Sequence, residues 1–234
     1  MKTDIELIVS DLSYTYPGGV KALDSISFHV ARGEKVAIIG PNGAGKSTLL
    51  LLLAELLSAD GTSKSIIRSS DHSVQEGEIA FLFQNPDDQI IATSVEDDVG
   101  FSLLQRGFDP VRVRELVEVS LRQVHLVGYE GRSPLEMSFG EKKRMCLAGC
   151  LIGEPSMLYL DEPALGLDPR ETGQLRTILR EIPRTMLLSS MDFHIISGLA
   201  DRVVLLNRGK VVTVGSPAEI LSDRRLMETN GLAI

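Results

Sequence analysis

Short runs of apolar residues, separated by glycine, proline and polar residues, recur along the chain. Near the N-terminus, the runs at residues 5–9, 26–30 and 36–39 predict β-strands, and the Pro-Gly-Gly at residues 17–19 predicts a turn between the first two. The third run enters a glycine-rich segment, and the leucines of residues 49–57 then predict a helix. The chain therefore opens with strands, a glycine loop and a helix, in that order.

The middle of the chain changes from polar to helical character. Residues 58–78 are polar and rich in turn-forming residues, which predicts an exposed excursion, and the apolar run 79–83 predicts the next strand. From about residue 94 to residue 127 the pattern is helical, with breaks at Gly107 and Pro110. We interpret this helical segment as a separate lobe.

Later apolar runs return to the length of strands. Residues 157–160 and 186–188 predict two more strands, and residues 203–206 and 210–214 predict a closing pair around residues 207–209. Short strands that alternate with helices indicate an α/β fold with a largely parallel sheet.

The composition is that of a globular protein and excludes several other classes. The 234 residues suffice for one large domain or a core with an inserted subdomain, and 43% of them are hydrophobic. The 24 basic and 32 acidic residues give a net charge of −8, so we expect no nucleic-acid partner, because phosphate backbones attract basic surfaces. No apolar run approaches the roughly 18 to 20 residues of a membrane span, and the acidic N-terminal segment is unlike a secretory signal. We expect a soluble chain that can still dock on a membrane protein.

The two cysteines, Cys146 and Cys150, are four residues apart on an expected helix. Two cysteines exclude a disulfide framework, which favours a reducing cytoplasm. We expect both side chains to be buried as small apolar groups.

The most specific chemical signal is the glycine-rich segment after the third strand. It reads Gly40-Pro41-Asn42-Gly43-Ala44-Gly45-Lys46-Ser47, followed by Thr48. This segment matches the phosphate-binding loop pattern in full, in which backbone N–H groups and the positive end of a helix surround a phosphate. We expect Lys46 to reach the terminal phosphates and the Ser47 hydroxyl to bind Mg²⁺. The alternative, a glycine turn that binds nothing, is disfavoured by the flanking strand and helix.

A pair of carboxylates follows the strand predicted at residues 157–160. Asp161 fits the residue that holds the metal, and Glu162 fits the group that polarises a water for attack on the γ-phosphate. The alternative is a helix cap followed by an acid in the first turn. Beside a complete phosphate-binding loop we favour the metal ligand and the base.

With these motifs in their order, the chain resembles the ATP-binding cassette (ABC) ATPases along nearly its whole length. The resemblance implies a P-loop NTPase core with a parallel sheet, an N-terminal antiparallel β subdomain and an inserted helical subdomain. Residues 1–234 would form one ABC ATPase domain, with 1–87 and 153–234 as the nucleotide-binding core and 88–152 as the helical subdomain. The implied cofactors are ATP and Mg²⁺.

The resemblance also implies roles for further residues. Tyr16 is placed like the aromatic residue that stacks on adenine. Gln84 matches the Q-loop glutamine, which touches the metal and joins Lys46 and Glu162 in the expected catalytic set. Asp168 matches the D-loop, which crosses the interface between two subunits.

Two segments indicate a subfamily. Residues 16–19 (Tyr-Pro-Gly-Gly) and 83–89 (Phe-Gln-Asn-Pro-Asp-Asp-Gln) are similar to the energy-coupling factor (ECF) and cobalt/nickel importer ATPases. For the second segment, an exposed acidic turn is the alternative. The similarity implies ATP-driven closure of a dimer, coupled to transport of a metal ion or vitamin. It implies a transmembrane transporter subunit and a second ABC ATPase subunit as partners, in a homo- or heterodimer. It further implies a cytoplasmic location, peripheral on the inner face of the membrane.

The family's Leu-Ser-Gly-Gly-Gln signature is altered in this chain. It reads Met137-Ser138-Phe139-Gly140-Glu141, followed by Lys142-Lys143-Arg144. The resemblance implies that Ser138 and Gly140 cap ATP held by the partner. Ser138 and Glu141 also have the spacing of a capping box. The carboxylate of Glu141 near a triphosphate is unfavourable unless it points away or pairs with the basic residues 142–144. As an alternative to such pairing, the three basic residues predict a solvated helix face.

The family's switch histidine is also replaced, because Met191 occupies its position and methionine donates no hydrogen bond. His194, three residues further on, is a weak candidate for its replacement. Met191, Phe139 and Glu141 therefore suggest reduced hydrolysis. They leave two alternatives to a transport ATPase: a weakly hydrolysing regulatory subunit and a soluble ABC protein without a membrane partner.

Overall fold

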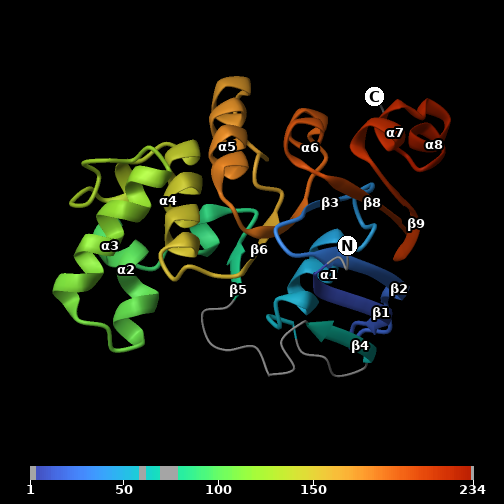
Figure 1. Cartoon of the computed structure of the whole chain (residues 1–234), viewed down its shortest axis with the longest axis horizontal. Helices are drawn as coiled ribbons and strands as arrows, with labels where there is room; N and C mark the ends of the chain where they lie inside the picture. Colours follow the sequence, from blue (N-terminus) through green and yellow to red (C-terminus); the bar gives the residue numbers. More distant parts are fainter. Residues whose placement is uncertain (1–3, 58–61, 69–78, 233–234) are drawn as a thin grey trace.

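The computed structural model describes residues 4–57, 62–68 and 79–232 and contains two β-sheets (Figure 1). The first sheet is antiparallel. Its order is β2 (Lys21–Ala31), β1 (Ile5–Thr15) and β4 (Thr62–Arg68). The expected turn at residues 17–19 is confirmed, since the Gly19 N–H donates to the Tyr16 carbonyl at 2.8 Å.

Strand β4 corrects the interpretation of residues 58–78 as an exposed excursion. Residues 62–68 pair with β1 in an antiparallel register that runs from Tyr14 opposite Thr62 to Leu7 opposite Arg68. The pairing uses backbone groups, so a polar segment beside a long strand can join a sheet without an apolar run of its own. The rest of the predicted excursion, residues 58–61 and 69–78, lies outside the described residues.

The second sheet is largely parallel, as the alternation of strands and helices predicts. Its order is β5 (Ile79–Leu82), β6 (Met157–Asp161), β7 (Thr185–Ser189), β3 (Lys35–Ile39), β8 (Arg202–Asn207) and β9 (Lys210–Gly215). Only β9 runs antiparallel to its neighbour, as the expected closing hairpin. The carboxyl ends of β3, β6 and β7 therefore meet at one edge of the sheet, where open α/β sheets bind ligands.

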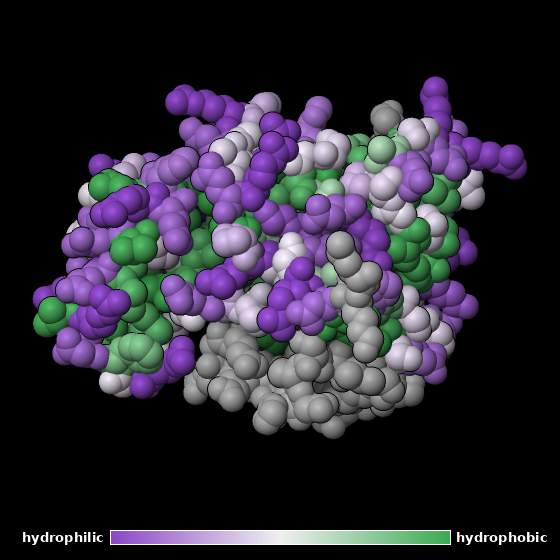
Figure 2. Space-filling view, viewed as in Figure 1, coloured by the Kyte–Doolittle hydropathy of each residue, from purple (hydrophilic) through white to green (hydrophobic). Residues whose placement is uncertain are grey.

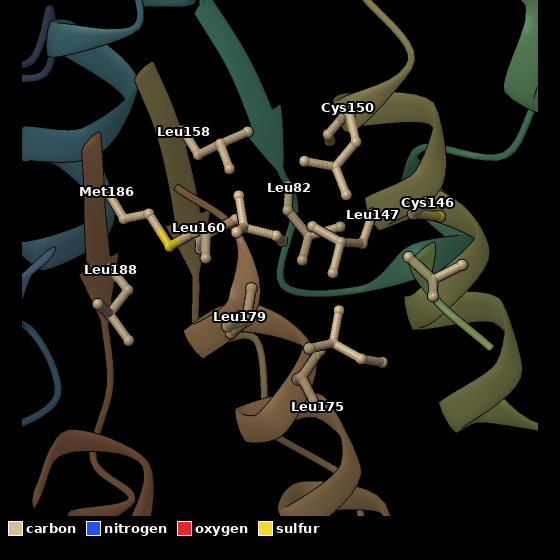
Figure 3. Close-up of a cluster of buried hydrophobic side chains, with 14 of the residues drawn as sticks. Leu82, Cys146, Leu147, Cys150, Leu158, Leu160, Leu175, Leu179, Met186 and Leu188 are labelled. Carbon is tan, nitrogen blue, oxygen red and sulfur yellow. The ribbon is translucent and has the colours of Figure 1, made fainter. Parts of the chain in front are cut away.

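Both faces of the sheet are buried along the parallel strands β3 and β5–β8, because their side chains alternate between two apolar clusters. On one face, α1 (Lys46–Leu53) lies between the two sheets and packs on Tyr159 and Leu187. On the other, α5 (Pro169–Glu181) and α6 (Phe193–Leu199) cover the sheet, and leucines of α5 meet Leu158 and Leu160 (Figure 3).

The predicted helical segment forms α2 (Val95–Gln105) and α3 (Pro110–Gln123), beside α4 (Phe139–Leu151). The expected breaks are confirmed, because Gly107 has a φ of +79° and Pro110 is the first residue of α3, after its N-cap Asp109. Helix α4 buries Cys146 and Cys150, both free, against the main core, as expected (Figure 3). The assignment of residues 88–152 to a subdomain stays a prediction.

The remaining elements are short. They are the 3₁₀ helices η1 (Pro86–Asp88) and η2 (Pro134–Glu136) and the C-terminal helices α7 (Pro217–Ser222) and α8 (Arg224–Thr229). Within the described part of the chain, no helix combines the length and apolar content needed to cross a membrane.

Candidate functional site

The glycine-rich segment forms a loop between β3 and α1 and lines a cavity of about 190 Å³. The cavity is lined by residues 42–48 together with Gln84 and Glu162. The helix begins at Lys46 and ends at Leu53, not at the predicted residues 49–57, because Gly45 caps it in a left-handed conformation with a φ of +101°. The first turn of α1 thus belongs to the loop, and its free N–H groups are available for an anion.

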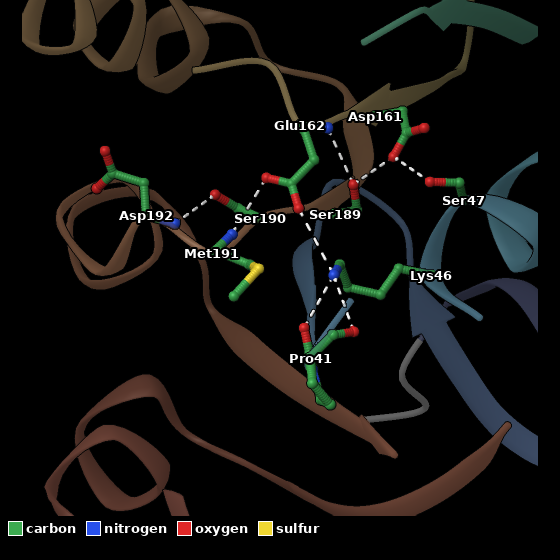
Figure 4. Close-up of polar contacts among 10 residues, drawn as sticks. Pro41, Lys46, Ser47, Asp161, Glu162, Ser189, Ser190, Met191 and Asp192 are labelled. Atoms are coloured by element: carbon green, nitrogen blue, oxygen red, sulfur yellow. Dashed lines mark hydrogen bonds and ion pairs between the residues drawn. The ribbon is translucent and has the colours of Figure 1, made fainter. Parts of the chain in front are cut away.

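Lys46 is almost fully buried and bends back over the loop (Figure 4). Its Nζ donates to the Gly40 carbonyl at 2.8 Å and the Pro41 carbonyl at 3.4 Å. It also lies 3.7 Å from Oε1 of Glu162. The ammonium therefore stands between the loop and the carboxylate, where it can exchange carbonyl contacts for phosphate oxygens.

Asp161 ends β6 and faces the loop, and its Oδ1 accepts from the Ser47 hydroxyl at 3.0 Å (Figure 4). The same oxygen accepts from the Ser189 hydroxyl at 2.5 Å. A serine hydroxyl beside a carboxylate offers the oxygen ligands that Mg²⁺ prefers. These residues fit Mg²⁺.

Glu162 adopts a strained backbone conformation, with a φ of +44°, that hydrogen bonds hold on both sides. Its N–H donates to the carbonyl of Ser189 at 3.2 Å and the hydroxyl of Ser189 at 2.9 Å, while its own carbonyl accepts from Leu165 N–H at 3.1 Å. Burial raises the pKa of the Glu162 carboxyl, and the Lys46 ammonium and the Met191 N–H oppose that rise. The helix-cap alternative for this carboxylate pair is wrong, because Asp168 caps the helix that follows.

The segment after β7 brings Met191 beside this carboxylate, since its backbone N–H donates to Oε2 of Glu162 at 3.2 Å (Figure 4). Its thioether side chain has no hydrogen to donate. His194 is exposed on α6, and within the described part of the chain its recorded contacts are those of its backbone with Asp192 and Arg176. The structure therefore offers no support for His194 as a replacement.

Comparison with known proteins identifies this arrangement. The family profile described as "ABC transporter" matches residues 23–165, which is more than half of the chain. The chain belongs to the ABC transporter family. Membership implies that it binds and hydrolyses ATP, as the loop and the two carboxylates predict.

The relatives of this ABC ATPase refine the comparison. The energy-coupling factor transporter ATP-binding protein EcfA of Methanothermobacter thermautotrophicus is 43% identical, over 96% of this chain and 75% of the relative. A putative ABC transporter ATP-binding protein of Gloeobacter violaceus is 40% identical, over 97% of this chain and 96% of the relative. The structure of CbiO1 from Clostridium perfringens, part of the transporter complex CbiONQ, has a TM-score of 0.84 and 30% identity, covering 99% of this chain and 96% of that one. The expected ABC ATPase fold and the resemblance to the ECF group are confirmed.

Two residues expected at the site of the ABC ATPase, Tyr16 and Asp168, are not among those that line its cavity. The Tyr16 hydroxyl is 2.9 Å from the Thr48 hydroxyl, and its ring meets Tyr14 edge-on, so Tyr16 stands beside the loop. Asp168 caps α5 in a capping box with Glu171, a role that our sequence analysis missed. Stacking on adenine and crossing of a dimer interface stay predictions for these residues.

The altered signature segment begins α4, and the expected capping box of Ser138 and Glu141 is confirmed. The Glu141 carboxylate accepts from the Tyr129 hydroxyl at 2.6 Å and from the Ser138 N–H at 2.8 Å. The Tyr129 hydrogen bond, above all, lowers the pKa of Glu141. Tyr129, which our sequence analysis did not consider, is thus the main partner of this charge.

The solvated basic face predicted for residues 142–144 is wrong at Lys143, which is fully buried. Lys142 does reach the surface, where it forms an ion pair with Asp87 at 2.7 Å. The lysine is buried because its helix face packs against the ends of the Q-loop and β6 rather than against water.

The glycine and phenylalanine of the signature segment pack against their own chain. A side chain at Gly140 would approach Oε1 of Glu171 to 2.2 Å, and the Phe139 ring lies against Gly166. The lining of the phosphate-loop cavity does not include this segment. Ser138 and Gly140 are therefore not among the residues that line this chain's own loop cavity, and Gly140 lies beside Glu171, the capping-box partner of Asp168.

Replacing Tyr129 by Phe should lower the free energy of unfolding by about 1 kcal/mol at pH 7, because a hydrogen bond to a charged, partly solvated group is lost. The pKa of Glu141 is lowered in the fold, so this stabilisation is fully present above the ordinary carboxyl pKa of about 4.3 and is lost as the pH falls from there through the lowered pKa of the folded state. Urea unfolding at pH 7 and pH 3.5 measures the difference. An equal loss in a Glu141→Ala background, in which the acceptor of the Tyr129 hydroxyl is absent, would contradict the assignment.

Proposed function

We propose that this chain is the ATP-binding and ATP-hydrolysing subunit of an ECF-type importer. The observation that carries the proposal is the convergence of four side chains from two segments, the start of α1 and the end of β6. Lys46, Ser47 and Glu162 line one cavity, and Asp161 accepts from the Ser47 hydroxyl beside it. The relative named EcfA and the CbiO1 structure support the assignment to a transporter.

Each residue of the cavity has a proposed part in hydrolysis. The loop residues 40–48 bind the triphosphate through backbone N–H groups, and Lys46 neutralises its terminal phosphates. Ser47, Asp161 and Gln84 would hold Mg²⁺, which supplies positive charge against the phosphate oxygens. Glu162 orients the attacking water and accepts its proton, and the adjacent Lys46 favours its ionised form.

Other residues would complete the site in a dimer with a second ABC ATPase subunit. Tyr16 stacks on adenine beside the loop, and Asp168 lies at the interface between subunits. Ser138 and Gly140 face the nucleotide of the partner subunit, which agrees with their separation from this chain's own cavity.

The helical lobe would receive the transmembrane partner. Figure 2 shows apolar side chains among polar ones over this lobe. Its exposed apolar residues include Phe101, Leu104, Phe108 and Val111. Exposed apolar groups of this kind suit a protein partner. We therefore propose a cytoplasmic subunit, peripheral on the inner face of the membrane, whose closure on ATP drives uptake of a metal ion or vitamin.

The test combines turnover with purification. Phosphate release by the purified chain should require Mg²⁺ and stop in EDTA. The tagged chain, isolated from detergent-solubilised membranes of its own host, should retain one integral membrane protein through gel filtration. Turnover without any such partner would favour the soluble ABC protein instead.

Met191, Phe139 and Glu141 would keep turnover low. Met191 presents only its backbone N–H to Glu162, so no side chain from this position can donate to a γ-phosphate. Phe139 adds a ring that is 39% exposed at the start of α4, where it faces the partner.

Replacing Met191 by His should raise kcat about tenfold, because one added hydrogen bond in the transition state contributes about 1 to 1.5 kcal/mol. Steady-state phosphate release measures the change. Met191→Leu, which adds no donor, should remain at the wild-type rate. If the histidine variant gains nothing, the replacement at this position does not limit hydrolysis.

A further inference from the structure

One buried cation in α4 stands apart from the cavity but contacts two residues that line it. The Lys143 side chain is fully buried, and its Nζ donates to the carbonyl oxygen of Gln84 and, at 3.2 Å, to that of Glu162. The ammonium also lies 5.8 Å from the centre of the Phe139 ring. The Lys143 ammonium therefore joins α4, which begins in the signature segment, to the Q-loop and to the end of β6.

This cation has no carboxylate within ion-pair distance in the described part of the chain, so backbone carbonyls hold it. Burial lowers the pKa of Lys143 to about 8, while the charges of Asp161 and Glu162 act in the opposite direction. Burying an ammonium costs free energy that an apolar side chain would not cost. We therefore look for the role of this buried ammonium in the two backbone carbonyls that it binds, those of Gln84 and Glu162.

The two carbonyls belong to residues whose positions matter for hydrolysis. Gln84 and Glu162 both line the phosphate-loop cavity, although they are far apart in sequence. Glu162 has a φ of +44°, a conformation that persists only when its surroundings hold it. Lys143 holds its carbonyl, while Ser189 accepts from its N–H on the other side.

The same helix is fixed at its start by the segment that follows Glu162. The Phe139 ring lies against Gly166, and Gly140 lies against the Glu171 side chain of the next capping box. A displacement of the start of α4 would therefore move Lys143, and with it the backbone of both cavity residues.

We propose that Lys143 is a positioning residue for ATP hydrolysis. Its ammonium fixes the backbone of Gln84 and Glu162 so that their side chains face the nucleotide, and it connects both to the helix that begins at the signature segment. The inference rests on the proposed hydrolytic function and adds to it a link between the surface that faces the partner and this chain's own site.

The test compares Lys143→Met with Lys142→Met, a matched change at the neighbouring residue that pairs with Asp87 outside the cavity. Loss of the Lys143 hydrogen bonds should reduce kcat by about 10- to 100-fold, since a small displacement of a catalytic group has effects of this size. The Kd for ATP, measured in EDTA, should stay within about twofold of wild type, because the loop contacts remain. Lys142→Met should retain both values.

A conservative variant separates positioning from packing. Lys143→Arg keeps donors for both carbonyls and should recover a substantial part of kcat, with melting temperatures recorded for every variant. If Lys143→Met does not fold, Lys143→Gln, whose shorter side chain keeps one amide donor group, takes its place, and its kcat should fall below that of Lys143→Arg. A kcat within twofold of wild type, or a loss of kcat that follows the loss of ATP affinity, would overturn the proposal.

Turnover of the wild-type chain separates the role of Lys143 from the hydrolytic function. If the wild-type chain shows no Mg²⁺-dependent turnover, the hydrolytic function fails and the role of Lys143 falls with it. If the wild-type chain hydrolyses ATP and Lys143→Met does so equally well, only the role of Lys143 is overturned.

Discussion

Replacing Glu162 by Gln should reduce kcat for ATP hydrolysis by at least about 100-fold, the lower range for loss of a general base. The amide keeps the shape of the side chain but cannot accept the proton of the attacking water. Affinity for ATP should be kept or increased, because a carboxylate 3.7 Å from Lys46 is removed from the vicinity of the phosphates. Steady-state phosphate release and equilibrium binding of ATP measure the two effects separately.

An exposed glutamate provides the control for this substitution. Glu118 lies on the surface of α3, away from the cavity, so Glu118→Gln should leave kcat unchanged. Residual turnover above a tenth of wild type in Glu162→Gln would mean that another group serves as the base. Equal and negligible turnover in wild type and variant would favour the weakly hydrolysing alternative that Met191 suggests.

The parts of the site that could be predicted are those formed within short stretches of chain. The phosphate-binding loop is contiguous, and the apolar strands before it and before Asp161 predict that both reach the same edge of a parallel sheet. The contact of the Ser47 hydroxyl with Asp161 at 3.0 Å follows from that geometry. Strand identity was predictable because buried parallel strands are continuous apolar runs.

Contacts that depend on the packing of distant segments were not predictable in the same way. Ser189 bonds to Asp161 only because β7 lies beside β6, and a serine at a strand end is otherwise an ordinary polar residue. Lys143 stands in a basic run that predicts a solvated side chain. In the structure it is bonded to the carbonyl of Gln84, a residue 59 positions earlier in the sequence. Strand β4 was missed for a related reason, because its pairing with β1 uses backbone groups and needs no apolar pattern.

The predicted start of α1 is wrong, because the actual start depends on one glycine. The leucine pattern predicts a helix that begins at residue 49. In the structure Gly45 caps the helix, so Lys46 and Ser47 belong to its first turn. The conformation of Gly45, with a φ of +101°, is one that side-chain-bearing residues rarely adopt. The same glycine fixes where the loop ends and where its lysine and serine point.

Replacing Gly45 by Ala should therefore lower the free energy of unfolding by about 3 kcal/mol or more. An alanine Cβ would lie 2.7 Å from the carbonyl oxygen of Ala22 in β2 and 2.9 Å from a methyl group of Leu23. The carbonyl belongs to a sheet strand and cannot turn away as a flexible side chain would. Calorimetry should show a fall in Tm of at least about 6 °C for a chain of this size.

A second glycine of the loop separates backbone strain from this contact. Gly43 also has a left-handed φ, +78°, but a Cβ there would meet no atom within 4 Å. Gly43→Ala should cost only the conformational strain, about 1 to 2 kcal/mol. If both variants lose equal stability, the approach of β2 to the loop is not what requires Gly45. A larger loss in Gly45→Ala would mean that the N-terminal sheet presses directly on the phosphate-binding loop and holds its last residue before the helix in place.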